Sequence, residues 1–229
     1  MTIRVFPDLQ ELSAAAAQAV SDELIEAIFE RGRATLALAG GNTPRQTYAL
    51  LAETENIDWD KVEIYFTDER AIPPTHPDSN FQMACEELLE LLPVQPAAVH
   101  RMEADQHQLG NAARQYEALL PEALDVLILG LGQDGHTASL FPDDPALYSA
   151  DRVVAVQGPR PPFARLTITP RVIDTAKNVF VLATGAEKAE AVARALEGEL
   201  DVATTPAQLA RKGVWFLDEE AARELKERS

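Results

Sequence analysis

The stretch DVLILGLGQDGHTASLFP, residues 125–142, decides the fold. Its first half is a continuous apolar run, which is typical of a strand buried inside a parallel sheet. The loop that follows has glycines at 130, 132 and 135, which is the G-x-G-x-x-G spacing of a dinucleotide-binding turn. Asp134 and His136 lie in the same loop, although such a turn does not need them. The loop therefore predicts either a cofactor cradle or a site of catalysis.

The residues after the glycines argue against a dinucleotide. Such a site needs a long helix after the turn and an acidic residue at the end of the next strand. Pro142 and Pro145 leave no room for that helix. The next expected strand, 152–157, ends in Gln157-Gly158 and carries no acid that could hold a ribose. We therefore expect no nucleotide and no other cofactor.

His136 and Asp134 suggest a different chemistry for the loop. A neutral imidazole can act as a general base near neutral pH, and a carboxylate two residues earlier could orient the ring. The alternative is that Asp134-Gly135 forms a simple turn and that His136 caps a helix. The loop taken alone does not decide between these two interpretations.

Outside this stretch, short apolar runs alternate with segments of helical periodicity. Strands are expected at 2–6, 35–39, 61–67, 152–157, 165–169, 178–184 and 213–218. Helices are expected over a stripe from Leu9 to Ile28 that should end near Gly32, from Pro44 with Thr43 as N-cap, and from residue 79 or 80 to about 92. Further helices are expected at roughly 107–120, from residue 187 to about 197 and after the last strand. This alternation predicts one α/β domain over residues 1–229, with a doubly wound, mostly parallel, Rossmann-like sheet and helices on both faces.

Composition excludes several classes of partner. The formal net charge is −17, from 20 basic and 37 acidic residues, which argues against nucleic acid and anionic membranes. Cys85 is the single cysteine, so the sequence predicts no internal disulfide and a reducing, cytoplasmic location. We expect no secretory signal and no membrane span. The four histidines show no metal-ligand spacing, so no metal is expected.

Three loops should meet at the carboxyl edge of the predicted sheet, where ligands bind in such folds: 40–44, 68–80 and 130–142. The first presents backbone N–H groups and a hydroxyl at a helix N-terminus, which suits a phosphate but also fits an ordinary turn. In the second, Arg70 could clamp an anion or belong to a solvated charge cluster. Arg165 and Lys188 are further candidates for an anion site, or surface residues.

These segments together resemble the 6-phosphogluconolactonase family. The matching pieces are LAGGNTP (38–44), FTDERAIPPTHPDSN (66–80), LGLGQDGHTASLFP (129–142), RLTIT (165–169) and TGAEKA (184–189). The resemblance implies a cytoplasmic hydrolase without cofactor or obligate protein partner, which opens 6-phospho-D-glucono-1,5-lactone with water to give 6-phosphogluconate. The fold that it implies is the deaminase/lactonase type of α/β sheet. The family's usual serine in the first loop is Asn42 here, which puts a hydroxyl contact at that position in doubt.

The resemblance also implies a role for each candidate residue. His136 takes a proton from water, and Arg70 balances the negative charge that develops on the substrate. Asp134 and Asp68 are expected to orient His136 and Arg70 respectively. The implied phosphate site comprises the turn Gly40, Gly41, Asn42 and Thr43, with Lys188 and either Arg45 or Arg165 nearby. Ser139 lacks the G-x-S-x-G context of a nucleophile.

Two rival functions share some of these residues. The glucosamine-6-phosphate deaminase/isomerase family has a similar loop, but there the histidine is followed by a segment like IAFNEP with a glutamate. Here the segment is TASLFP, and the first acid is Asp143. A non-catalytic sugar-phosphate-binding regulator would keep the phosphate turn and lose a catalytic group. The presence of both His136 and Arg70 favours the enzyme.

Overall fold

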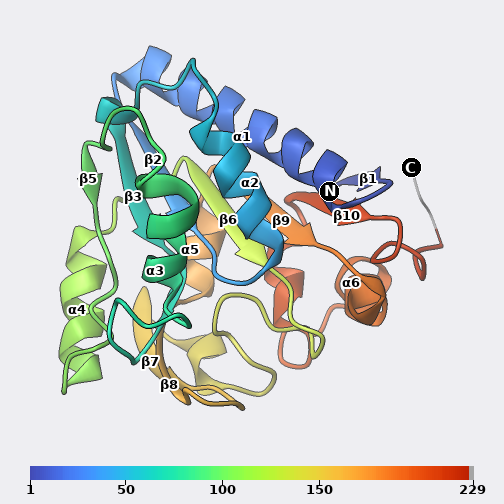
Figure 1. Ribbon diagram of the computed structural model, residues 1–229. Coiled ribbons are helices and arrows are strands. Elements are labelled where there is room, and N and C mark those ends of the chain that lie inside the picture. Colours follow the sequence, from blue (N-terminus) through green and yellow to red (C-terminus); the bar gives the residue numbers. More distant parts are fainter. Residues whose placement is uncertain (227–229) are drawn as a thin grey trace.

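The protein is built around a seven-stranded parallel sheet, which the computed structural model shows with helices packed around it (Figure 1). The structure describes residues 1–226. The strand order is β1 (Thr2–Phe6), β10 (Val214–Asp218), β9 (Asn178–Ala183), β6 (Val126–Gly130), β2 (Ala34–Leu38), β3 (Val62–Phe66) and β5 (Ala98–Val99). Every neighbouring pair in this sheet is parallel. The expected α/β class with a mostly parallel sheet is therefore confirmed.

The central strands are buried because they carry almost no polar side chains. All five residues of β2 are buried, as are the first four of β6. A parallel strand covered on both faces reads as a continuous apolar run rather than as an alternating one. The apolar segment that follows Asp125 in the sequence thus forms β6, in the middle of the core.

Local signals in the sequence set the helix boundaries. The helices are α1 (Leu9–Arg31), α2 (Thr43–Ala52), α3 (Asn80–Ala84), α4 (Leu109–Leu119), α5 (Pro170–Thr175) and α6 (Ala189–Glu197). A π-helical turn, Cys85–Leu89, continues α3, and short 3-10 turns lie at Trp59–Lys61, Pro145–Tyr148, Ala186–Lys188 and Pro206–Ala210. Asp8 accepts a hydrogen bond from the N–H of Glu11 at the start of α1, and Gly32, with φ of 72°, ends that helix. In Figure 1, α1 and α2 lie side by side along the sheet.

The order of the strands creates one switch point in the sheet. From β2 the chain continues to β3 and β5 on one side, whereas β6 lies on the other side of β2 and is followed outward by β9 and β10. In open α/β sheets, ligands bind where the strand order reverses, beyond the carboxyl ends of the strands. The loops after β2 and β6 flank that crevice.

A second, antiparallel sheet stands beside the main one, and the sequence did not predict it. It has the order β4 (Asp68–Arg70), β8 (Ala164–Ile168) and β7 (Val153–Gln157), and α4 packs against β7 and β8. Residues 68–70 were expected in a loop, but their main chain pairs with β8. Three charged residues carry no strand pattern of their own, so this strand exists only because its partner is present.

The helix expected after the last strand is not found within residues 1–226. Residues 219–224 form turns instead, in which Asp218 accepts a hydrogen bond from the N–H of Ala221. The end of the expected helix, 227–229, lies outside the described residues. Within residues 1–226, the structure has no helix with both the length and the apolar character needed to cross a lipid bilayer.

Candidate active site

A cleft of about 350 Å³ lies at the switch point of the sheet. Its walls come from the loops after β2 and β6, from β4 and β8, and from the segment after β9. Nine of the residues predicted for the site line it: Gly40, Gly41, Asn42, Thr43, Asp68, Arg70, His136, Arg165 and Lys188. Segments that are far apart in the sequence therefore meet in one place, as expected from the position of their loops.

His136 and Asp134 form a hydrogen-bonded pair at the edge of this cleft. The Nδ1 atom of His136 lies 2.5 Å from Oδ1 of Asp134, and the main-chain N–H of His136 donates to the same oxygen at 3.1 Å. Nε2 of His136 has no hydrogen-bond partner within residues 1–226. An imidazole held in this way through Nδ1 has its other nitrogen available for a proton.

The charge of Asp134 decides which nitrogen carries the hydrogen. Burial acts to raise the pKa of Asp134, but the hydrogen bond and the charge of His136 outweigh it and lower the pKa to about 2. Asp134 is therefore an ionised carboxylate near neutral pH, and an ionised carboxylate can only accept hydrogen bonds. It follows that Nδ1 of His136 donates, which leaves a lone pair on Nε2 in the neutral ring.

The glycines whose spacing resembled a dinucleotide turn make room for the pair of His136 and Asp134. A Cβ atom at Gly132 would overlap the imidazole of His136 and the carboxylate of Asp134. The N–H of Gly132 also donates to the carbonyl of His136 at 2.8 Å, and the N–H of Gly135 to the carbonyl of Gly132 at 3.0 Å. Gly132 is thus needed so that the ring can lie directly against the backbone.

Arg70 and Arg165 lie opposite each other on adjacent strands of the small sheet. They are register partners in the antiparallel pair of β4 and β8, and both line the cleft. Burial lowers the pKa of Arg165, Asp68 nearby acts to raise it, and Arg70 lowers it further. Like charges directly opposite each other on a sheet are destabilising. This pair is therefore a costly arrangement that suits the binding of an anion.

Arg70 has hydrogen-bonding capacity left for a ligand. Its Nη1 donates to the carbonyl of Asp78 at 2.5 Å. Its Nε is buried and has no partner within the described part of the chain. A buried N–H without an acceptor costs free energy, so an anion in the cleft would relieve that cost.

Asp68 does not orient Arg70, contrary to the expectation from the sequence. Ser139 Oγ donates to Asp68 Oδ2 at 2.6 Å, and Asn80 Nδ2 donates to Asp68 Oδ1 at 3.2 Å. Within residues 1–226 there is no hydrogen bond or ion pair between Asp68 and Arg70. Asp68 is buried and lies on the same face of β4 as Arg70, two residues later, but its carboxylate oxygens are already occupied by the hydrogen bonds from Ser139 and Asn80. Its negative charge acts on Arg165 instead.

The loop after β2 has a different cap from the expected one. Asn42, not Thr43, stands at the N-cap position of α2, and its side chain makes no capping hydrogen bond. Thr43 lies within the helix, and its hydroxyl is 3.0 Å from that of Thr184. A Cβ atom at Gly40 would overlap the side chain of Asn80. The loop thus leaves the side chain of Asn42 and the N-terminus of α2 available at the cleft.

Of the three basic residues proposed to bind the phosphate, the structure places two in the cleft and one outside it. Lys188 and Arg165 line the cleft, whereas Arg45 does not. Arg45 Nη1 instead lies 2.7 Å from Oε1 of Glu87, in a neighbouring depression of about 270 Å³. Burial lowers the pKa of Lys188, which Glu187 and Asp134 act to raise and Arg160 acts to lower.

Four residues at the site were not predicted from the sequence. Asn80, Thr184 and Glu187 line the cleft, and Phe141 packs against His136 with 4.8 Å between the ring centroids. All four lie in segments that the sequence analysis singled out, 66–80, 129–142 and 184–189. Those segments were noted for the resemblance, but no residue pattern within them marked these four side chains individually.

Comparison with known proteins gives consistent matches over almost the whole chain. Residues 7–217 match the family model described as glucosamine-6-phosphate isomerases/6-phosphogluconolactonase. A 6-phosphogluconolactonase of Synechocystis sp. is 36% identical over 220 residues, which cover 90% of this chain and 91% of the relative. The solved structure of 6-phosphogluconolactonase from Trypanosoma brucei has a TM-score of 0.81 and 32% identity, and covers 98% of both chains. A monomeric glucosamine-6-phosphate deaminase has a TM-score of 0.87 at 25% identity, and covers 98% of this chain and 100% of its own.

Proposed function

The chain belongs to the family of glucosamine-6-phosphate isomerases and 6-phosphogluconolactonases, as its sequence motifs indicated, and from this we propose that it hydrolyses 6-phospho-D-glucono-1,5-lactone to 6-phosphogluconate. One observation of the structure carries the proposal. His136, fixed through Nδ1 by Asp134, stands in a cleft whose other walls carry Arg70, Arg165 and Lys188. A base beside a cluster of cations suits the hydrolysis of an anionic ester.

In the reaction, His136 acts as the general base. Its Nε2 takes a proton from a water molecule while the water oxygen attacks C1 of the lactone. A tetrahedral intermediate forms, with the negative charge on the former carbonyl oxygen. The bond between C1 and the ring oxygen then breaks, and the imidazolium of His136 returns the proton to that oxygen as it becomes the C5 hydroxyl. The products are the open-chain carboxylic acid and a neutral His136.

The basic side chains of the cleft have two roles. Arg70 balances the charge on the oxygen of the tetrahedral intermediate, and removal of such a donor costs about 3–4 kcal/mol of barrier. Lys188 and the N-terminus of α2, with Gly41, Asn42 and Thr43, hold the phosphate. Arg165, opposite Arg70 in the sheet, adds a further positive charge to the wall of the cleft.

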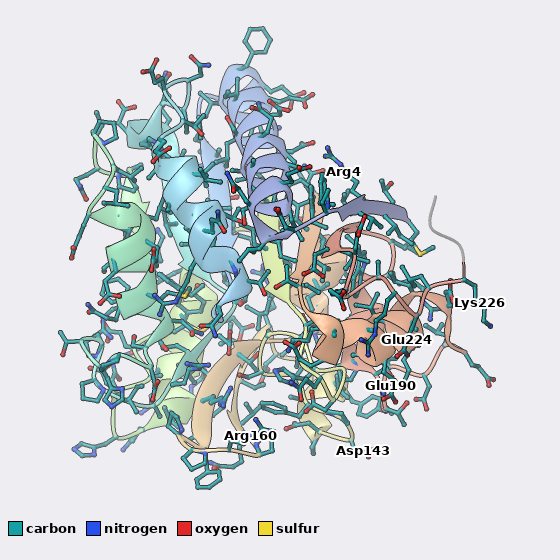
Figure 2. The ribbon with its side chains drawn as sticks, turned by 45° about the vertical axis from the view of Figure 1, so that its right-hand side comes forward. Arg4, Asp143, Arg160, Glu190, Glu224 and Lys226 are labelled. Carbon is teal, nitrogen blue, oxygen red and sulfur yellow. The ribbon has the colours of Figure 1, made fainter. Side chains whose placement is uncertain are left out.

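The loop after His136 favours the lactonase over the deaminase. The rival family has a glutamate in this loop, and the first acid here is Asp143. Asp143 is exposed and does not line the cleft. Figure 2 shows it at the lower end of the molecule, the same end as Arg160. A cytoplasmic location is part of the proposal, because the single thiol of Cys85 fits a reducing compartment.

The test is the hydrolysis of freshly prepared 6-phosphogluconolactone, followed by acid release and corrected for spontaneous opening. We expect rapid turnover by the protein and loss of most of it in His136→Ala, with binding of 6-phosphogluconate retained. Glucosamine 6-phosphate, assayed in parallel for release of ammonia, should not react. Deamination without lactone hydrolysis would favour the rival function, and near-normal turnover by His136→Ala would remove the general-base role.

A further inference from the structure

Phe141 contacts two polar residues of the cleft, His136 and Arg165. Its side chain is buried at the end of the loop that carries His136. Its ring centroid is 4.8 Å from that of His136, at an interplanar angle of 50°. The guanidinium carbon of Arg165 lies 5.4 Å from the same ring centroid. One aromatic ring therefore touches both the proposed base and a buried cation.

The contact with Phe141 adds to the constraints on the imidazole of His136. Asp134 holds Nδ1, and the missing Cβ of Gly132 lets the ring lie against the backbone. The hydrogen bond to Asp134 fixes one nitrogen, but a single hydrogen bond does not by itself prevent the ring from turning about its Cβ–Cγ bond. An aromatic ring packed 4.8 Å away, centroid to centroid, restricts that rotation.

The contact of Phe141 with Arg165 supplements the long hydrogen bonds that the guanidinium of Arg165 makes. Arg165 Nε donates to the carbonyl of Pro162 at 3.3 Å, and Nη1 donates to Ser139 Oγ at 3.4 Å. Both distances lie beyond the usual range for such bonds. A guanidinium placed over an aromatic face is attracted by the ring electrons, and more strongly when it is removed from water. The ring of Phe141 therefore contributes to holding Arg165 at the cleft wall.

We propose that Phe141 is a positioning residue, whose ring holds the imidazole of His136 against Asp134 and the guanidinium of Arg165 at the cleft wall. Phe141 touches neither water nor substrate in this role, and it acts through the two residues that do. The proposal rests on the proposed function for its effect on catalysis. Its effect on the geometry of His136 stands independently of any substrate.

The first experiment compares Phe141→Leu, which keeps an apolar side chain but removes the ring, with Phe141→Tyr, which keeps the ring. For lactone hydrolysis, Phe141→Leu should lower kcat about 10-fold or more and leave KM within about twofold, because displacement of a catalytic group by even 1 Å is costly. Phe141→Tyr should keep most of the wild-type kcat, because it keeps the ring. The matched control is Phe180→Leu, another buried phenylalanine, which packs on Phe216 in the main sheet. It should lower thermal stability comparably and leave kcat unchanged.

The second experiment needs no activity. Nitrogen-15 spectra of the His136 ring at about pH 8, where imidazoles are ordinarily neutral, report which ring nitrogen carries the hydrogen. We expect a single Nδ1–H form in the wild type and in Phe180→Leu, and a mixture of both forms in Phe141→Leu. Unchanged kcat together with a single form in Phe141→Leu would overturn the proposal. A wild type without lactonase activity would overturn the proposed function, while the spectra would still decide the role of Phe141.

Discussion

The carboxylate of Asp134 binds His136 twice, once through the side chain and once through the main chain. Oδ1 lies 2.5 Å from Nδ1 of the ring and 3.1 Å from the main-chain nitrogen of the same residue. One carboxylate oxygen thereby links the ring nitrogen to the main chain of the same residue. An orienting acid two residues before the base in the sequence achieves this without any tertiary contact.

Asp134→Asn should lower kcat for the lactone about 10- to 100-fold, which is the usual cost of losing a partner that orients a functional imidazole. The amide has no charge to stabilise the imidazolium, and its NH₂ group can face Nδ1. Steady-state kinetics measure the effect. The control is Asp143→Asn, which removes an exposed carboxylate from the same loop, outside the cleft. Equal losses in both variants would contradict a specific role for Asp134.

The pH dependence of kcat/KM should contain no ionisation of Asp134 between pH 4 and 7. The pKa of Asp134 is held at about 2, so this carboxylate remains charged throughout that range. Because its folded pKa lies below the ordinary value, its contribution to stability is present above about pH 4 and is lost as the pH falls through about 2. An inflection between pH 4 and 5 that is present in the wild type and disappears in Asp134→Asn would show the prediction to be wrong.

Gly132→Ala should abolish most activity and leave the protein folded. The new Cβ would occupy the space of the His136 ring and the Asp134 carboxylate, so both must move. Thermal melting measures the stability, and lactone turnover measures the function. Gly110→Ala is the matched control, since Gly110 lies in α4 and its nearest obstacle is a flexible arginine at 3.9 Å. Normal turnover by Gly132→Ala would mean that the ring has another place to lie.

Lys188→Ala should raise KM about 10-fold and change kcat little, because one charge-assisted contact to the phosphate is lost from substrate and transition state alike. Arg45→Ala should leave KM unchanged, since Arg45 is paired with Glu87 outside the cleft. Initial-rate kinetics on both variants separate these roles. The reverse result would move the phosphate site to the depression beside Arg45.

Glu69→Gln should destabilise the protein by about 1–3 kcal/mol, the cost of an unsatisfied buried group. The carboxylate of Glu69 accepts hydrogen bonds from the N–H groups of Arg70, Asn80 and Phe81 and from Ser79 Oγ. An amide would present two of its own hydrogens to these donors. Urea denaturation measures the loss, and exposed Glu86→Gln serves as the control. Equal midpoints for the two variants would show that the four contacts do not depend on the carboxylate.

The sequence predicted those features that have a local cause. Gly32 ends α1 because a left-handed residue closes a helix, and the run from residue 126 is a buried strand because an uninterrupted apolar run suits a strand covered on both faces. The meeting of the loops after β2 and β6 followed from a general property of parallel sheets. The pairing of His136 with Asp134 was expected from the resemblance and from their separation of only two residues.

The remaining features depend on distant parts of the chain. The strand β4 has three charged residues, and only β8 gives it hydrogen-bond partners, so neither the second sheet nor the partners of Asp68 could be read locally. Arg45 directly follows Pro44, which lines the cleft, but its side chain pairs with Glu87 outside the cleft. Phe141 reads as an ordinary apolar residue until the fold brings Arg165 against its ring.

The register of β4 against β8 has a consequence for how the cleft could change. Main-chain hydrogen bonds, and not side-chain contacts, place Arg70 opposite Arg165. Either arginine can therefore be exchanged for another residue without moving its partner, and substrate preference could be retuned one charge at a time. A shift of β8 by one residue would turn Arg165 to the other face of the sheet and leave Arg70 without its partner in the cleft. Insertions in the 158–163 loop, which ends where β8 begins, are thus expected to be far less tolerated than substitutions at the two arginines.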